Sequence, residues 1–196
     1  MELGVTVDEI MEWVPCPEYT RERISGLFAG RERMTALEIL DLQISAVDRL
    51  WAVLREQLIT ARELHELACR FAEHALENER AAGREPDPRS WAGIEAKRAW
   101  LRGEIDDEAL KAASAAAWAA RHAAFSAVSA SKVAVSASKV AVSAREAAFS
   151  AVSASKVAVL VREVAILARE AGSAADEGNY ADYQIGITRE MVHERR

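Results

Sequence analysis

The feature that most constrains the fold is a long repeat of small residues in the C-terminal half of the chain. The eleven letters FSAVSASKVAV occur at 125–135 and again, unchanged, at 149–159. The heptad SASKVAV occurs twice in succession, at 129–135, inside the first copy, and at 136–142, directly after it. Neither glycine nor proline occurs from Glu104 to Ala171, so no residue in this stretch interrupts a helix. A seven-residue hydrophobic period is typical of helices that pack against other helices, and it indicates a structural element rather than a catalytic one.

On a helix, this repeat places small, apolar and polar residues on separate faces. Alanines spaced alternately by four and three residues form one continuous stripe, which we call the alanine seam: Ala130, Ala134, Ala137, Ala141, Ala144, Ala148 and Ala151. Valines flank the seam, and serines and lysines occupy the opposite face, so the pattern predicts packing neighbours on at least two sides. A straight helix over 107–171 would be about 100 Å long. We therefore expect a break or sharp bend within 124–154 that folds the segment back as an antiparallel helix pair.

The composition predicts an all-α protein, a helical bundle that includes this Ala/Ser/Val-rich repeat region. Hydrophobic residues make up 51% of the 196 residues but aromatic residues only 6%, so alanine supplies much of the apolar content. We divide the chain into an N-terminal helical segment, 1–103, and an Ala-rich heptad-repeat region, 104–196, that packs on it within one compact unit. The predicted helices cover 7–13, 18–28, 36–41, 46–56, 61–81, 88–102, 107–171 and 181–194.

Several helix starts are recognisable from capping residues. A threonine followed three residues later by a glutamate has the spacing of a capping box, in which each side chain binds the other residue's backbone N–H. This spacing occurs at Thr6, Thr35 and Thr60, and Ser45 with Asp48 is a weaker version. The dipeptide at 87–88, Asp-Pro, predicts a further helix start, because proline fits the first helical position.

Charge and composition argue against several functional classes. The segment 112–168 carries a net charge of +4 and the rest of the chain −10, yet the basic residues are sparse and not interleaved with aromatic ones, which disfavours nucleic-acid binding. A solvated helix face explains the basic residues better, and the basic repeat could also dock on the acidic N-terminal half. We find neither an apolar run long enough to span a membrane nor an export signal. With two cysteines, Cys16 and Cys69, we expect reduced thiols and a cytoplasmic location.

The residues that could carry chemistry are few. His65 and Cys69 lie one helical turn apart, with the spacing of a zinc motif in which cysteine replaces the second histidine. His74 does not converge with them, so we expect no metal site, no cofactor and no enzymatic activity. Instead we expect Cys69 to be a small core residue and His65 a half-buried hydrogen-bonding group. On the helix 88–102, Lys97 and its neighbouring arginines are expected to turn away from the core or to extend their charged ends to solvent.

Candidate partner-binding residues lie in three places. Trp13 precedes the rigid turn Pro15–Pro17, where it could contact a partner or close the end of the bundle. Glu73, Glu77 and Glu79 are expected to form a solvated acidic face on the helix 61–81, which could attract a basic partner. Three lysines of the repeat could line a groove for a charged ligand: Lys132, Lys139 and Lys156.

Five stretches together carry a family resemblance: WVPCPEYTRERISGLFAGRERMTALEILDL, DRLWAVLREQLI, LHELACRFAEHAL, DPRSWAGIEAKRAWLRGEI and the Ala-rich tail. The chain resembles a bacterial and phage family of immunity proteins, related to inhibitors of polymorphic toxins, over about residues 10–125. The tail is similar in composition only, because serine, lysine and valine stand where tryptophan, arginine and aspartate are expected in the family. The resemblance implies a helical protein that binds a partner, and it carries over no catalytic residue.

We therefore expect a non-enzymatic, immunity-type inhibitor that neutralises a cognate toxin or nuclease by direct binding through helix faces and loops of 1–103. One alternative is a phage or prophage anti-defence protein that binds a host defence protein or sequesters a charged small molecule at the repeat lysines. A second alternative is a structural oligomer joined through the alanine seam.

Overall fold

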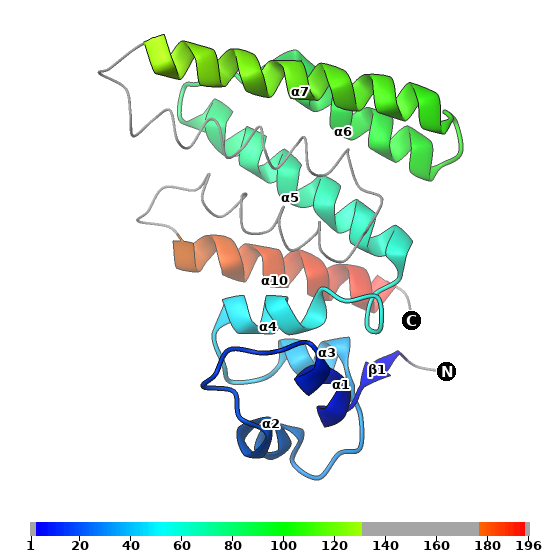
Figure 1. The fold of residues 1–196 in the computed structure, drawn as a ribbon, viewed down its shortest axis with the longest axis vertical. Helices are drawn as coiled ribbons and strands as arrows, with labels where there is room; N and C mark the ends of the chain where they lie inside the picture. Colours follow the sequence, from blue (N-terminus) through cyan, green and yellow to red (C-terminus); the bar gives the residue numbers. More distant parts are fainter. Residues whose placement is uncertain (1–2, 131–176, 195–196) are drawn as a thin grey trace.

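The structure is a computed structural model that describes residues 3–130 and 177–194, and these residues form an all-α helical bundle (Figure 1). The predicted fold class is thereby confirmed. The elements are β1 (Gly4–Val5), α1 (Val7–Glu12), α2 (Arg21–Phe28), β2 (Met34–Thr35), α3 (Ala36–Leu40), α4 (Ala46–Val53), α5 (Ala61–Ala81), α6 (Pro88–Leu101), α7 (Asp107–Ala130) and α10 (Glu177–Glu194).

The helices are stacked along the long axis of the molecule (Figure 1). Helices α6 and α7 lie side by side at one end, and α5 packs beneath α6. Helix α10 lies against α4, and also contacts α3 and α5. The short helices α1 and α2 form the opposite end with the β1–β2 pair.

The predicted capping boxes explain where three helices begin. At α1, the Thr6 backbone N–H donates to Glu9 Oε2 at 2.7 Å, while the Glu9 N–H donates to Thr6 Oγ1 at 3.2 Å. Reciprocal pairs of the same kind begin α3 at Thr35 and α5 at Thr60. Ser45 caps α4, and Asp87 with proline at the next position begins α6. The structure confirms these starts. They could be predicted because each depends on residues at most three positions apart along the chain.

The sequence did not predict the short antiparallel pair of β1 and β2. Gly4 lies opposite Thr35 and Val5 opposite Met34, so the pair joins segments about thirty residues apart. A β-carbon on Gly4 would lie 3.1 Å from the Met34 carbonyl oxygen, closer than ordinary packing allows, so glycine suits this close approach of two backbones. The pair fixes the start of α1 beside the start of α3.

Helix α10 completes the core built by the N-terminal helices. Its buried residues include Tyr180, Ile185 and Met191, which belong to the same apolar cluster as residues of α3, α4 and α5. The Tyr180 hydroxyl donates to the Phe71 carbonyl oxygen at 3.2 Å. Arg189 donates to the Leu40 carbonyl oxygen, also at 3.2 Å. The helix begins at 177 rather than at the predicted 181, and the division into 1–103 and 104–196 stays a prediction.

Several predictions fall where the structure describes no residues. The alanine seam beyond residue 130, the repeat from 131 onward and the helix after 130 lie outside the described ranges, as does most of the segment 124–154 in which we expected the chain to fold back. The predicted start of the repeat helix at 107 is confirmed by α7. Cys16 is exposed, Cys69 is buried, and neither forms a disulfide, as expected. Among residues 3–130 and 177–194, no helix combines the length and apolar character needed to cross a bilayer.

Candidate partner-binding site

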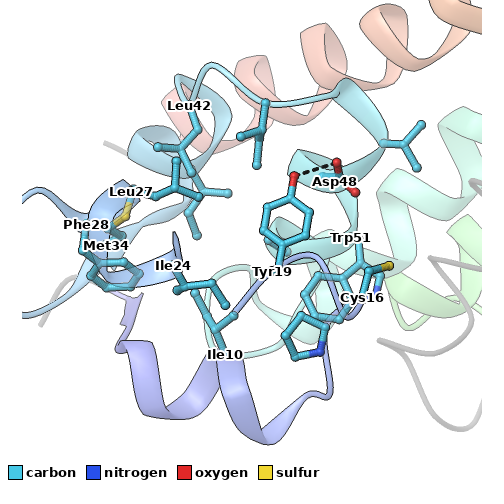
Figure 2. Close-up of a pocket in the computed structure, with 15 residues that line it drawn as sticks. Ile10, Cys16, Tyr19, Ile24, Leu27, Phe28, Met34, Leu42, Asp48 and Trp51 are labelled. Atoms are coloured by element: carbon cyan, nitrogen blue, oxygen red, sulfur yellow. Dashed lines mark hydrogen bonds between the residues drawn. The ribbon is translucent and has the colours of Figure 1, made fainter. Parts of the chain in front are cut away.

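An apolar groove opens at the end of the molecule formed by α1 to α4 (Figure 2). Its cavity volume is about 150 Å³. Apolar cavities of about this volume hold a benzene-sized group. Its walls are almost entirely hydrophobic, and they include Ile10, Tyr19, Ile24, Leu27, Phe28, Met34, Leu42 and Trp51. The groove can therefore accept one large apolar side chain.

The turn between α1 and α2 forms one wall of this groove. Val14 has a φ of +55°, which is unusual for a β-branched residue, and reverses the chain directly after α1. The backbone N–H of Tyr19 then donates to the Cys16 carbonyl oxygen at 2.8 Å, which closes a turn around Pro17. Thr20 caps α2 immediately afterwards. Together these local contacts place the ring of Tyr19 in the centre of the groove wall (Figure 2).

One polar pair lies in the otherwise apolar wall. The Tyr19 hydroxyl donates to Asp48 Oδ2 at 2.7 Å (Figure 2). The Ser45 hydroxyl donates to the same oxygen, also at 2.7 Å. Burial, together with this hydrogen bond to a carboxylate, raises the pKa of Tyr19 to about 12. Asp48 Oδ1 accepts no hydrogen bond from the described residues, and no arginine or lysine among them pairs with this carboxylate. Asp48 therefore offers an acceptor to a bound cation.

Trp13 lies beside this region, and its side chain packs against other residues of the protein. Its ring packs edge-on against Trp51, with ring centroids 6.2 Å apart. The Arg55 guanidinium lies over both rings, 4.5 Å from the Trp13 centroid and 4.7 Å from the Trp51 centroid. Such cation–π contacts hold the two indoles in place. The residue after Trp13, Val14, is 80% exposed, and Val47 at the groove is 47% exposed. A role of Trp13 in partner binding stays a prediction.

The three glutamates of α5 do not form one solvated acidic face, so this prediction is wrong for two of them. Glu73 is half-buried and accepts hydrogen bonds from Arg98 of α6. Glu79 is 3% exposed, and its Oε1 accepts from Arg84 Nη2 at 2.8 Å. Glu77 alone of the three is exposed, and it lies 3.8 Å from His74. Arginines on neighbouring segments draw the carboxylates inward, which a single helix pattern cannot predict.

His65 and Cys69 lie on the buried face of α5, and neither is arranged for catalysis. Burial raises the pKa of the Cys69 thiol to about 12, so the nucleophilic thiolate is disfavoured. The His65 ring packs edge-on against Trp100 at 5.7 Å, and burial lowers its pKa to about 4. No group of three histidines, cysteines or carboxylates in the described ranges could hold a metal ion. His65 is more buried than predicted, and no described residue forms a hydrogen bond with its Nδ1.

Lys97 is a further correction, because it is wholly buried rather than turned toward solvent. Its ammonium lies 4.0 Å from the centroid of the Trp100 ring and forms no hydrogen bond with a described residue. Desolvation lowers the pKa of Lys97, which the nearby Asp107 carboxylate partly opposes. The Trp100 indole N–H itself donates to Asp107 Oδ1 at 2.8 Å. The face of the Trp100 ring stabilises the Lys97 ammonium inside the protein, whereas the helical pattern predicted this charge at the surface.

The predicted site residues that the structure describes do not lie together. Trp13 lies near the groove at one end of the bundle, and Glu73 and Glu77 lie on α5. The lysines at 132, 139 and 156 lie outside the described residues. The sequence did not predict the groove or the position of Tyr19 in its wall, and it predicted Asp48 only as the capping partner of Ser45. The Ser45–Asp48 spacing was the available signal, but the contact with Tyr19 joins residues 29 positions apart.

Comparisons of the chain with models of protein families, with curated proteins and with solved structures find no match. The resemblance to immunity proteins therefore stays a prediction, based on the quoted segments alone.

Proposed function

We propose that the chain is a non-enzymatic binding protein of the immunity type, which inhibits a partner protein by direct contact through the groove at α1 to α4. The observation that carries this proposal is the open apolar cavity with a carboxylate in its wall, that of Asp48, which forms no ion pair with a described residue. A cleft with apolar walls and one or two polar groups is typical of a site that binds by shape and orientation. The cognate toxin or nuclease named by the resemblance is the expected partner, and the cytoplasm is the expected place of action.

Exposed apolar residues beside the groove support protein rather than small-molecule binding. Val14 and Val47 offer apolar surface to solvent next to Pro15 and Cys16 of the groove wall. Apolar surface around a pocket is typical of protein interaction sites. The backbone at Val14 adds a second argument. Non-glycine residues with positive φ cost free energy, and such strain is concentrated at functional sites.

The test is co-expression with a toxin encoded beside this gene. We expect the toxin alone to arrest growth and the wild-type chain to restore it. Ala52 lies in the groove and is half-buried, so Ala52→Phe fills the cavity with a ring. We expect this variant to lose protection and to bind the toxin at least tenfold more weakly. Ala115→Phe, the same change at an exposed position of α7, is the matched control and should protect. Full protection by a folded Ala52→Phe variant would contradict the proposed site.

A further inference from the structure

The charges of segment 3–60, which supplies the groove walls, indicate what kind of surface on a partner protein the groove binds. Residues 3–60 contain six arginines and ten carboxylates. Four arginines pair with carboxylates within this segment, and Arg49 pairs with Asp182. The remaining one, Arg55, lies over the two indoles. Each arginine of this segment therefore already contacts a carboxylate or an aromatic ring of the protein itself.

The carboxylates, in contrast, are in excess. Five carboxylates of the same segment have no ion pair with a described residue: Glu12, Glu22, Glu32, Asp48 and Glu56. Of these, Asp48 lies in the groove wall, where its Oδ2 accepts from two hydroxyls and its Oδ1 accepts no hydrogen bond from a described residue. A cation that approaches the groove meets a net negative field and one oriented carboxylate at its end.

We propose that the groove binds an amphipathic basic helix of the partner protein, with one leucine or phenylalanine in the cavity and an arginine or lysine one turn away on Asp48. The inference rests on the proposed function and specifies the partner's surface. A helix fits because apolar grooves between helices take up the apolar face of an amphipathic helix. A spacing of three or four residues places the anchor and the cation on the same face.

The test uses a synthetic amphipathic helix of leucine and lysine about 18 residues long, a length that favours helix formation. Its counterpart with glutamate in place of lysine is the charge control. We expect the basic peptide to bind, with amide shifts in nuclear magnetic resonance spectra confined to the groove, and the acidic peptide not to bind. Asp48→Asn keeps the hydrogen-bond acceptor for Tyr19 but removes the charge. We expect it to weaken binding about tenfold or more, since hydrogen bonds to charged groups are among the stronger ones.

Glu108→Gln is the matched control, because it removes one exposed carboxylate at the start of α7, at the opposite end of the molecule (Figure 1). It should leave peptide affinity within twofold of wild type. Equal losses in both variants would show non-specific attraction and overturn the proposal. Shifts outside the groove, or a dimer formed through the groove in sedimentation experiments, would overturn it as well.

The toxin assay separates this proposal from the proposed function. If Asp48→Asn protects fully while Ala52→Phe does not, the groove binds the partner but the basic helix is wrong. If both variants protect, the groove itself is not the inhibitory site. Loss of protection in both, with Glu108→Gln still protective, is the expected result.

Discussion

Acid should destabilise this protein through one buried imidazole, that of His65. The side chain is 6% exposed, and burial lowers its pKa to about 4 from about 6.5. Because the folded state holds the imidazole neutral, its full contribution to stability is present above pH 6.5 and is lost as the pH falls toward 4. The two pKa values correspond to a loss of at most about 2 kcal/mol at pH 5 and about 3 kcal/mol at pH 4.

The assay measures the free energy of unfolding in urea from pH 7.5 to pH 4 for the wild type and His65→Phe. Phenylalanine keeps a ring edge-on to Trp100 but accepts no proton. The fold also lowers the pKa of some carboxylates, for example that of Glu9, which accepts a hydrogen bond from the Thr6 backbone, but such groups affect both proteins equally. The difference between the two curves therefore isolates His65. Replacement of the exposed His193 by glutamine is the control and should follow the wild-type curve. Parallel curves for wild type and His65→Phe would refute the reasoning.

Three further predictions concern stability. Lys97→Met should raise the free energy of unfolding at pH 7 by about 1 kcal/mol, because it removes a buried charge without a hydrogen bond. Since the folded-state pKa of this lysine is lowered, the gain should shrink as the pH rises toward 10.4, and urea unfolding at both pH values checks this. Thr60→Ala should cost about 1 kcal/mol by removing the cap of α5, measured by thermal unfolding. Arg84→Ala should destabilise more than Glu79→Gln, because it leaves a buried carboxylate without its cation; equal losses in urea unfolding would contradict this.

The parts of the fold that sequence predicted correctly depend on neighbours along the chain. Helix α5 begins and ends at the predicted residues, and the capping boxes at Thr6, Thr35 and Thr60 all form. A cap is decided by two side chains within one turn, so it can be read without knowing what the helix packs against. The same holds for the apolar face of α5, where Leu64, Leu67 and the residues at their spacing are buried as expected.

The parts that sequence missed depend on contacts between distant segments. Glu73 of α5 is half-buried because it pairs with Arg98 of α6, which lies 25 positions away along the chain. The groove needs four helices and a turn at once, and its polar pair joins Tyr19 to Asp48 across 29 positions. A hydrophobic period shows which face of a helix is covered but not which element covers it.

The place of α10 in the core has a consequence for synthesis on the ribosome. Tyr180 and Arg189 reach groups at Phe71 and Leu40, which leave the ribosome more than one hundred residues earlier. Until residue 194 has emerged, the faces of α3, α4 and α5 that receive α10 have no cover from it. Nascent chains expose such faces during translation, and exposed apolar faces recruit chaperones and favour aggregation. Helix α10 therefore joins the core late in synthesis, and the contacts of Tyr180 and Arg189 form only after the helices that receive them have long emerged.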